Sequence, residues 1–442
     1  MIRGLPFFFS TRFFLIFGSA SALLIPLYLA HPSGILLPLA LDGIIVLAAV
    51  LDFLVAPSPT RVQLRRPLPY PLAVDRTQEI TIEASNGTGR PVPILVRDDV
   101  PEECRVESQP SKMIVSAGSI ALFYYRLTPL ERGEGIFGNI HFWLAGPLGL
   151  VWKRGEAPAA AKVKLYPGLA LIGDRRFGMW RPIAHDPIRA LKKASAGADF
   201  DSLREYVVGD DARLIHWGTT ARTGTPMVRQ NRIERSQTVF LVLDAGRMMT
   251  ARVQGKTKLD HGLNAALLVA YAALELGDKV GVMMVGQEIL CFLPPDNTRT
   301  QFGRILDATY ALKPRMEEPR FYLALSSLAS RLRRRSLVII VTDLIDERAS
   351  EGLMRYILGL LPRHLPLVVA LSDTELIALA ESIPRHKRDL YRQGVASGIL
   401  DRRDRLMAKL GSRGVLVMDA PPEKISLRLL DRYLDIKTRN RL

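Results

Sequence analysis

The chain has 442 residues, which corresponds to about three domains of ~150 residues rather than one. Hydrophobic residues at 48% and charged residues at 24% exclude wholesale disorder, and two cysteines without a Cys-x-x-Cys pair or Cys/His cluster exclude a disulfide scaffold and a structural zinc site. A net charge of +16 favours an anionic partner or a face held near anionic lipid, without deciding between them.

Two long apolar runs, residues 13–30 and 35–56, open the chain. Each is near the ~20 residues that a helix needs to cross the hydrocarbon core of a membrane. A cleaved signal peptide fits poorly, because the second run follows at once and no small-residue cleavage site is evident. Residues 1–60 are therefore predicted to form a two-helix transmembrane hairpin.

Basic residues flank this hairpin and are missing from the loop between the two runs; they are Arg3, Arg12, Arg61, Arg65 and Arg66. The positive-inside rule then places both termini, and everything after residue 60, in the cytoplasm. The sequence predicts a two-pass protein of the cell (inner) membrane.

The second apolar run contains two carboxylates, Asp42 and Asp52. A charged group in hydrocarbon is costly, so each is expected to reach the interface or to make a helix-pairing contact. A proton relay is the alternative, but two helices cannot enclose a proton path without partners. The basic and acidic residues of 1–60 cancel, so the excess positive charge belongs to the soluble part, where apposition to an anionic leaflet is enough to explain it.

Residues 61–155 read as short strands separated by turns. Alternating or β-branched segments occur at 79–83, 92–96, 112–115, 120–127 and 140–144, and a turn sequence occupies 86–89. This spacing predicts an all-β sandwich domain. Residues 156–237 are charged and mixed and are expected to form a linker and a motif-bearing segment, with a short helix at 187–193.

From residue 238 to 442 strands and helices alternate. Strands are expected at 239–243, 279–285, 288–293, 336–341, 367–371 and 415–418, and helices at 261–276, 301–312, 322–332, 352–361, in two stretches up to 410, and at 427–433. The alternation predicts a Rossmann-type α/β domain with a mostly parallel sheet, whose functional loops follow the carboxyl ends of the strands.

Two of these strands end in an aspartate, Asp244 and Asp343. Adjacent carboxylates at this edge are able to hold a hard divalent cation. Aspartate is also a favoured N-cap residue, so either side chain alone is equally explained as the cap of the following helix.

The segment before the sheet domain carries the most specific motif. Residues 199–206 read Asp-Phe-Asp-Ser-Leu-Arg-Glu-Tyr, residues 209–217 read Gly-Asp-Asp-Ala-Arg-Leu-Ile-His-Trp, and residues 220–222 read Thr-Ala-Arg. With Arg-Gly at 132–133 and Gly-Pro-Leu-Gly-Leu at 146–150, this signature resembles the von Willebrand factor A-like family labelled domain of unknown function fifty-eight. The resemblance spans essentially the whole chain. It implies two membrane spans, a β-rich domain, a von Willebrand A-like sheet domain and a link to MoxR-type AAA+ ATPases in protein assembly or maturation.

The chain departs from this family's pattern at the metal site. Serines are expected two and four positions after Asp244, but Gly246 and Met248 stand there, and Phe321 lies near the place of a coordinating threonine. Neither a glycine nor a thioether supplies a hard oxygen ligand. Asp244 and Asp343 with water leave room for weak Mg²⁺ binding, or Arg247 neutralises both without metal. A degenerate metal site with no cofactor is expected.

The signature residues are expected to bind a partner or to fix a loop over the β-domain junction, anchored by Trp217; they are Arg204, Glu205, Tyr206, Gly209, Asp210, Asp211, Arg213, Trp217 and Arg222. Arg–carboxylate pairs fix loop geometry by paired hydrogen bonds. The enzymatic alternative is a metal-dependent hydrolase that uses Asp210, Asp211, His216 and Asp343. No nucleophile elbow or His-Glu-x-x-His motif accompanies them.

The leading hypothesis is a membrane-anchored, non-catalytic adaptor that presents the von Willebrand A-like domain to a cytoplasmic MoxR-type AAA+ ATPase. No catalytic residue and no small-molecule substrate are predicted. Specific nucleic-acid binding is not expected either, because aromatic side chains for base stacking are not interleaved with the basic residues.

Overall fold

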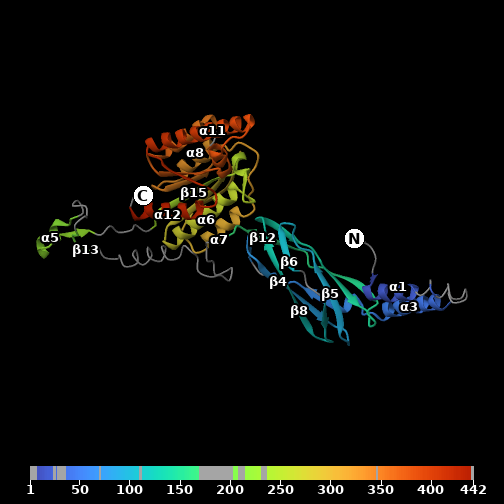
Figure 1. Ribbon diagram of the computed structural model, residues 1–442. Coiled ribbons are helices and arrows are strands. Elements are labelled where there is room, and N and C mark those ends of the chain that lie inside the picture. The colour runs from blue at the N-terminus through green and yellow to red at the C-terminus, as the bar shows by residue number, and fades with distance from the viewer. Residues whose placement is uncertain are drawn as a thin grey trace. The chain divides into compact units, whose positions relative to one another are not determined.

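The structure is a computed structural model of the chain. It describes residues 7–22, 26, 36–68, 71–108, 112–168, 203–207, 215–229, 236–344 and 347–439. The chain divides into two compact units, Met1–Tyr166 and Pro167–Leu442 (Figure 1).

The N-terminal unit contains two helices, α1 (Thr11–Ala22) and α3 (Leu36–Val55), which lie side by side and extend from one end of the β-sheets (Figure 1). The stretch Leu36–Arg61, which includes the 3-10 turn Pro59–Arg61, has a mean hydropathy of 2.4 and is mostly unburied. Within the described residues it is the one helix long and apolar enough to span a membrane. The predicted span at 13–30 is described over the 12 residues of α1; residues 23–25 and 27–30 lie outside the described residues.

Two antiparallel sheets, with the strand orders β1-β11-β10-β5-β7 and β2-β4-β8-β6, share one hydrophobic core. In β4 the inward residues Ile80 and Ile82 alternate with outward polar ones, as the period of two predicted. The strands are β1 (Phe7–Phe9), β2 (Val62–Arg65), β4 (Gln78–Asn86), β5 (Val92–Asp98), β6 (Cys104–Ser108), β7 (Met113–Val115), β8 (Ile120–Pro129), β10 (Ile140–Ala145) and β11 (Val151–Ala157).

The β-rich unit continues beyond the predicted boundary at residue 155. Strand β12 (Ala161–Tyr166) pairs with β9 (Gly133–Phe137) and β3 (Leu72–Ala73), so residues 156–166 belong to the sheets and not to a linker. Gly155 lies in strand β11 and leaves space for the Phe142 ring, since a Cβ there would lie 2.3 Å from Phe142 Cζ. The predicted helix at 187–193 lies outside the described residues.

The C-terminal unit contains a six-stranded sheet with the order β19-β18-β15-β20-β21-β22. All neighbours are parallel except the edge strand β19, so the predicted α/β class is confirmed. Strand order reverses between β15 and β20, which is the switch point where doubly wound sheets bind ligands. The strands are β15 (Thr238–Asp244), β18 (Lys279–Val285), β19 (Ile289–Asp296), β20 (Leu337–Thr342), β21 (Leu365–Leu371) and β22 (Leu416–Ala420).

Helices cover both faces of this sheet, with α8, α9 and α11 on one face and α6, α7 and α12 on the other (Figure 1). The four central strands are buried along nearly their whole length, which explains their runs of Val, Ile and Leu. The helices are α6 (Lys258–Glu275), α7 (Gln301–Thr309), α8 (Phe321–Arg331), α9 (Glu347–Leu360), α10 (Thr374–Glu381), α11 (Lys387–Ser412) and α12 (Ile425–Thr438). A 3-10 turn (Arg247–Thr250) and a hairpin of β16 (Arg252–Val253) and β17 (Lys256–Thr257) follow β15.

Candidate functional site

Asp244 ends β15 at the switch point and is buried. Its Oδ1 accepts a hydrogen bond from the Gly246 amide at 2.7 Å, and its Oδ2 accepts one from the Thr342 hydroxyl at 2.7 Å. Burial raises the pKa of the Asp244 carboxyl to about 6, and the nearby negative charge of Asp343 adds to the effect. Both oxygens therefore already have partners within the fold.

Asp343 follows β20 and is paired with two buried cations. Lys258 Nζ lies 2.7 Å from Oδ2, and Arg403 Nη1 lies 2.6 Å from Oδ1. Lys258 also lies 3.5 Å from Asp373, and Arg403 Nη2 lies 2.7 Å from Asp419. We call these five residues the buried ion-pair network. It joins α6 and α11 to the carboxyl ends of three strands.

The positions of these cations follow from the local folding of α6 and α11. Thr257 caps α6 in a capping box with Asp260, which starts the helix at Lys258. Arg403 lies within α11, on the same face as the buried Ala396 and Leu406. A buried charge is tolerated only when it is paired, and each cation here meets two carboxylates.

The donor set does not fit the metal that the fold family implies. A cation at Asp343 would have to displace Lys258 and Arg403, and Gly246 supplies no side-chain oxygen. A serine is also sterically excluded at 246, because a Cβ there would lie 2.5 Å from Pro319 Cδ. Within the described ranges, no group of three or more His, Cys, Asp or Glu side chains is placed to hold a metal.

The half-buried Met248 lies in the 3-10 turn after β15. Arg247, which the sequence offered as the neutralising cation, instead pairs with Glu318 at 2.6 Å on the surface. Lys258 and Arg403 neutralise Asp343, and the sequence analysis did not identify either of them. The sequence pattern that could have indicated them is a basic residue at a position that faces inward, Lys258 in α6 and Arg403 in α11.

The described residues of the signature, with Met227–Arg229, form a small antiparallel β-α-β unit. Strand β13 (Leu203–Glu205) pairs with β14 (Met227–Arg229), and α5 (Trp217–Thr223) lies between them in the chain. His216 caps α5, since its Nδ1 accepts the Thr219 amide at 3.2 Å. The Thr220 hydroxyl accepts the Met227 amide at 3.0 Å, which ties the helix to the second strand. In this structure the His216 ring serves as a helix cap.

The structure places only part of the predicted signature cluster. The backbone of Arg204 lies in β13, while its side chain is outside the description, as are four whole residues: Gly209, Asp210, Asp211 and Arg213. Glu205 and Arg222 are exposed and Tyr206 is half-buried. Trp217 is 69% exposed; most of the loop that it is expected to anchor lies outside the described residues, so this role stays a prediction. Trp217 is the first residue of a helix that buries none of its side chains.

Residues 202–381 match the family model described as "Protein of unknown function DUF58", the family that the signature resembles. The uncharacterized proteins Rv1480 of Mycobacterium tuberculosis (strain ATCC 25618 / H37Rv) and Mb1516 of Mycobacterium bovis (strain ATCC BAA-935 / AF2122/97) are each 24% identical over 206 residues, 46% of this chain. The chain spans 62% of the length of these relatives.

Two solved structures are similar to the chain. One is the conserved hypothetical protein BatB from Bacteroides thetaiotaomicron, with 15% identity, a TM-score of 0.33, and coverage of 46% of this chain and 100% of that one. The other is the SpRpn10 VWA domain, with 12% identity, a TM-score of 0.29, and coverage of 45% and 95%.

Proposed function

We propose that this protein is a membrane-anchored, non-catalytic adaptor whose von Willebrand A-like sheet domain docks a cytoplasmic partner protein. A MoxR-type AAA+ ATPase is the partner that the family resemblance implies. The buried ion-pair network is the observation that carries the proposal. It satisfies the charges at the edge of the sheet where a ligand would otherwise bind.

Catalysis by general acid or base requires a group that is free to exchange a proton with a substrate. Both oxygens of Asp343 are paired with buried cations, and both oxygens of Asp244 accept hydrogen bonds within the fold. These contacts favour a fixed surface, which suits a docking role. The hydrolase alternative draws on Asp210, Asp211, His216 and Asp343. Asp343 and His216 are engaged in structural contacts, and Asp210 and Asp211 lie outside the described residues.

We also propose a two-pass topology with both termini and both compact units in the cytoplasm. Strand β1, directly before α1, pairs with β11, and Asp52 near the end of α3 accepts hydrogen bonds from the turn before β11. Both of these helix ends thus meet the same β-sheet. If α3 spans the membrane, α1 has to return through it. The Ser21 hydroxyl donates to Asp42 Oδ2 at 3.0 Å, which supports a pair of neighbouring helices.

The test is an affinity purification of the intact tagged protein in mild detergent, from a membrane extract of cells that produce it, with and without ATP. We expect an AAA+ ATPase to be enriched with the wild type and reduced with Trp217→Ala, because exposed tryptophans are frequent anchors of interfaces. Tyr322→Ala, at another exposed aromatic residue, is the matched control.

Failure to retain an ATPase in any lane would contradict the adaptor proposal. Turnover of a phosphoester by the purified protein with Mg²⁺ or Mn²⁺, lost in Asp343→Asn, would replace it with the hydrolase.

A further inference from the structure

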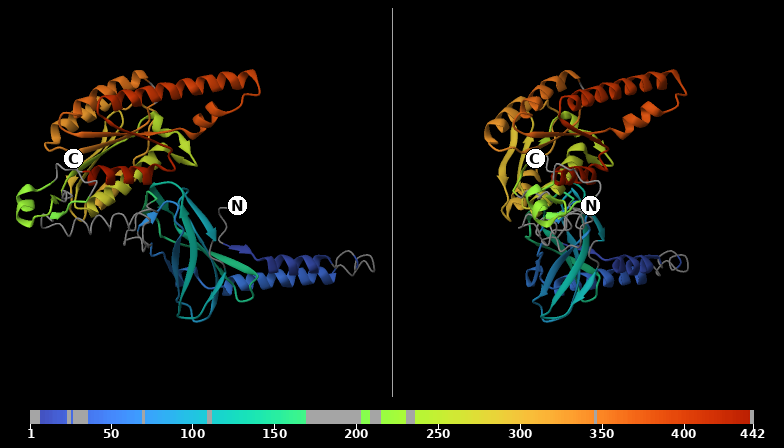
Figure 2. Two further views of the ribbon diagram at one scale, coloured as in Figure 1. Left: turned by 60° about the vertical axis from the view of Figure 1, so that its left-hand side comes forward. Right: turned by 90° about the vertical axis from the view of Figure 1, so that its left-hand side faces the viewer.

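The helical hairpin formed by α10 and residues 387–396 of α11 extends beyond the rest of the sheet domain (Figure 2). Helix α11 has 26 residues and is therefore about 39 Å long. Strand β22 beside it has five residues, and the first buried residue of α11 is Ala396. The first two turns of α11 are thus not needed to cover the sheet.

This hairpin carries an exposed apolar surface. Ile383 is 89% exposed and Tyr391 is 76% exposed, and Leu390 and Val395 are exposed beside them. A groove of about 220 Å³ runs between the two helices and is lined by Leu376, Leu379, Tyr391, Arg392, Val395 and Ala396. Single exposed apolar residues are common, but a cluster with a concave centre is typical of an interaction site.

The groove is preformed. Gln393 Nε2 donates to the carbonyl oxygens of Ala380 at 3.0 Å and Ser382 at 3.1 Å, which holds the end of α10 against α11. Asp389 accepts the amides of Arg385 and His386 and so fixes the turn between the helices. A partner would therefore not bear the entropic cost of ordering the hairpin.

The base of the hairpin belongs to the buried ion-pair network. Asp373 caps α10 through the amides of Glu375 and Leu376, and it also lies 3.5 Å from Lys258. Arg403 connects α11 to Asp343. The hairpin is thereby held in one direction relative to the switch point of the sheet.

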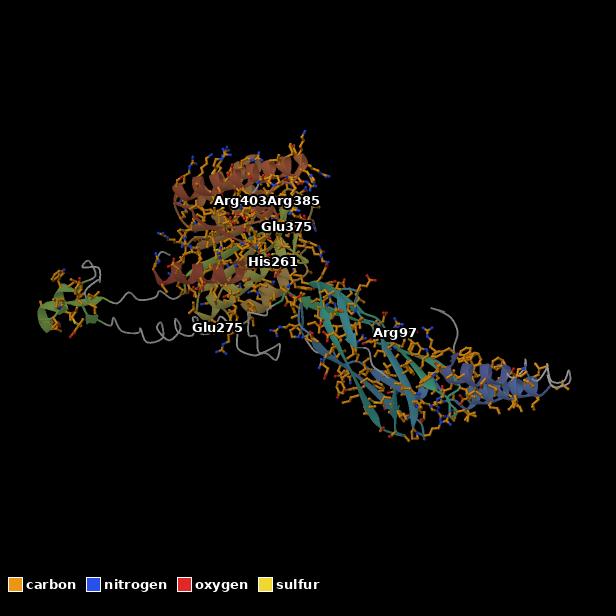
Figure 3. The ribbon with its side chains drawn as sticks, in the orientation of Figure 1. Arg97, His261, Glu275, Glu375, Arg385 and Arg403 are labelled. Atoms are coloured by element: carbon orange, nitrogen blue, oxygen red, sulfur yellow. The ribbon has the colours of Figure 1, made fainter. Side chains whose placement is uncertain are left out.

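Four exposed cations lie in the turn and the first turns of α11 and form a cationic rim on that side of the groove, which Arg392 lines: Arg385, Lys387, Arg388 and Arg392. On the other side, α10 carries the exposed carboxylates Glu375 and Glu381. Among the described residues none of the four side chains has a carboxylate partner, and the carboxylate of Asp389 is already used by the turn. Figure 3 labels Arg385 and Glu375 at this end of the domain. An apolar groove with a cationic rim is complementary to apolar side chains flanked by carboxylates.

We propose that the α10–α11 hairpin is the docking site for an acidic amphipathic segment of the partner protein. The inference rests on the adaptor function and names the chemistry of the partner. An apolar side chain of the segment enters the groove beside Tyr391, and its carboxylates pair with Arg388 and Arg392. A second copy of this chain is a poor occupant, because its net charge of +16 is repelled by the cationic rim of the first copy. A flat lipid surface does not fill a two-walled groove.

Two fluorescein-labelled helical peptides of about 16 residues test the proposal. Both place leucine at i, i+3, i+4 and i+7; one has glutamate and the other lysine at the remaining positions. Fluorescence anisotropy is measured against the full-length protein in nanodiscs of neutral lipid. We expect the glutamate peptide to bind, with an affinity that falls as salt is raised, and the lysine peptide not to bind.

We expect Tyr391→Ala to lower the affinity for the glutamate peptide at least tenfold. The charge reversal Arg388→Glu with Arg392→Glu should have the same effect. The matched controls are Tyr322→Ala on α8 and Arg402→Glu, an exposed residue of α11 away from the groove lining; both should bind like the wild type. Equal binding of the two peptides, or equal loss in the controls, would overturn the proposal. Protection of the hairpin from hydrogen exchange on anionic nanodiscs without peptide would instead identify the partner as lipid.

The two proposals fail separately. If the ATPase is retained equally by wild type and Tyr391→Ala, the hairpin is not its docking site although the adaptor function stands. If no ATPase is retained but the glutamate peptide binds through Tyr391, the adaptor proposal fails and the acidic-segment site stands.

Discussion

Asp244 illustrates at the scale of one residue how burial becomes a dependence of stability on pH. Its pKa rises from 3.8 to about 6 in the folded chain, so the folded state binds more protons than the unfolded state between these values. The free energy of unfolding therefore falls as pH rises from 3.8 to about 6, because the buried carboxyl ionises. The total decrease is roughly 3 kcal/mol, at ~1.4 kcal/mol per pKa unit.

We predict that Asp244→Asn gains stability relative to the wild type as pH is raised from 4 to 7, because asparagine does not ionise. Hydrogen exchange of peptides from Thr238–Asp244, corrected for the intrinsic rate, measures the difference in detergent-solubilised protein. Asp296→Asn is the control and should not show this gain, because hydrogen bonds from Thr298 help to lower, and not raise, the pKa of the Asp296 carboxyl. A difference independent of pH would contradict the prediction.

The ion pair between Lys258 and Asp343 is a second residue-scale case. Both side chains are buried, so Lys258→Ala removes one of the two cations paired with Asp343 and leaves Arg403 alone to balance it. We expect the sheet domain to be destabilised by about 3 kcal/mol. The double variant Lys258→Ala with Asp343→Asn should lose less free energy of unfolding than the two single variants lose together. Pulse proteolysis in urea measures all three, and Arg247→Ala, in an exposed pair with Glu318, should have a small effect. Additive losses would show that the pair is uncoupled.

Helix glycines with different surroundings make a matched test at the scale of elements. A Cβ at Gly394 in α11 would meet nothing within 4 Å, so Gly394→Ala should stabilise the hairpin by about 0.5–1 kcal/mol through helix propensity. A Cβ at Gly262 in α6 would lie 2.8 Å from Val341 Cγ1, so Gly262→Ala should destabilise the sheet domain. Hydrogen exchange in α11 and α6 measures the stability change caused by each substitution. An increase in stability with Gly262→Ala would contradict this packing.

The junction of α3 with the β-rich unit depends on Asp52. Its carboxylate accepts the amides of Leu148, Leu150 and Val151 at 2.7, 2.8 and 3.0 Å. We predict that Asp52→Asn turns an amide NH₂ toward these donors and loosens the turn by about 1–3 kcal/mol. Faster hydrogen exchange or proteolysis at 146–151, with strand β8 unchanged, would bear this out. Unchanged exchange there would show that the carboxylate is dispensable.

For the whole molecule, the testable quantity is the topology in the membrane. In a background with Cys104→Ser and Cys291→Ser, a membrane-impermeant maleimide should label Ser33→Cys in intact cells. Ser330→Cys, at an exposed residue of α8, should be labelled only after permeabilisation. Labelling of both sites in intact cells, or of neither, would contradict the two-pass arrangement with a cytoplasmic sheet domain.

Much of the fold follows from local pattern. Strands such as 239–243 and 337–341 are β-branched and Leu-rich because they are buried on both faces, and the alternation along 79–83 follows from a sheet with one buried face. The apolar run at 36–55 required no tertiary information. The positions of Asp244 and Asp343 at strand ends were readable in the same way, because a strand's end is a local property.

Only the tertiary structure decided which groups these carboxylates meet. Lys258 and Arg403 are 85 and 60 positions from Asp343, and Leu150 is 98 positions from Asp52. Such contacts depend on the crossovers of the chain and on the register of the sheets, which no local propensity encodes. The same holds for strand β12, whose partners lie far away in the chain. Sequence periodicity thus determined the elements, while long-range packing determined that Asp343 is paired with the chain's own cations.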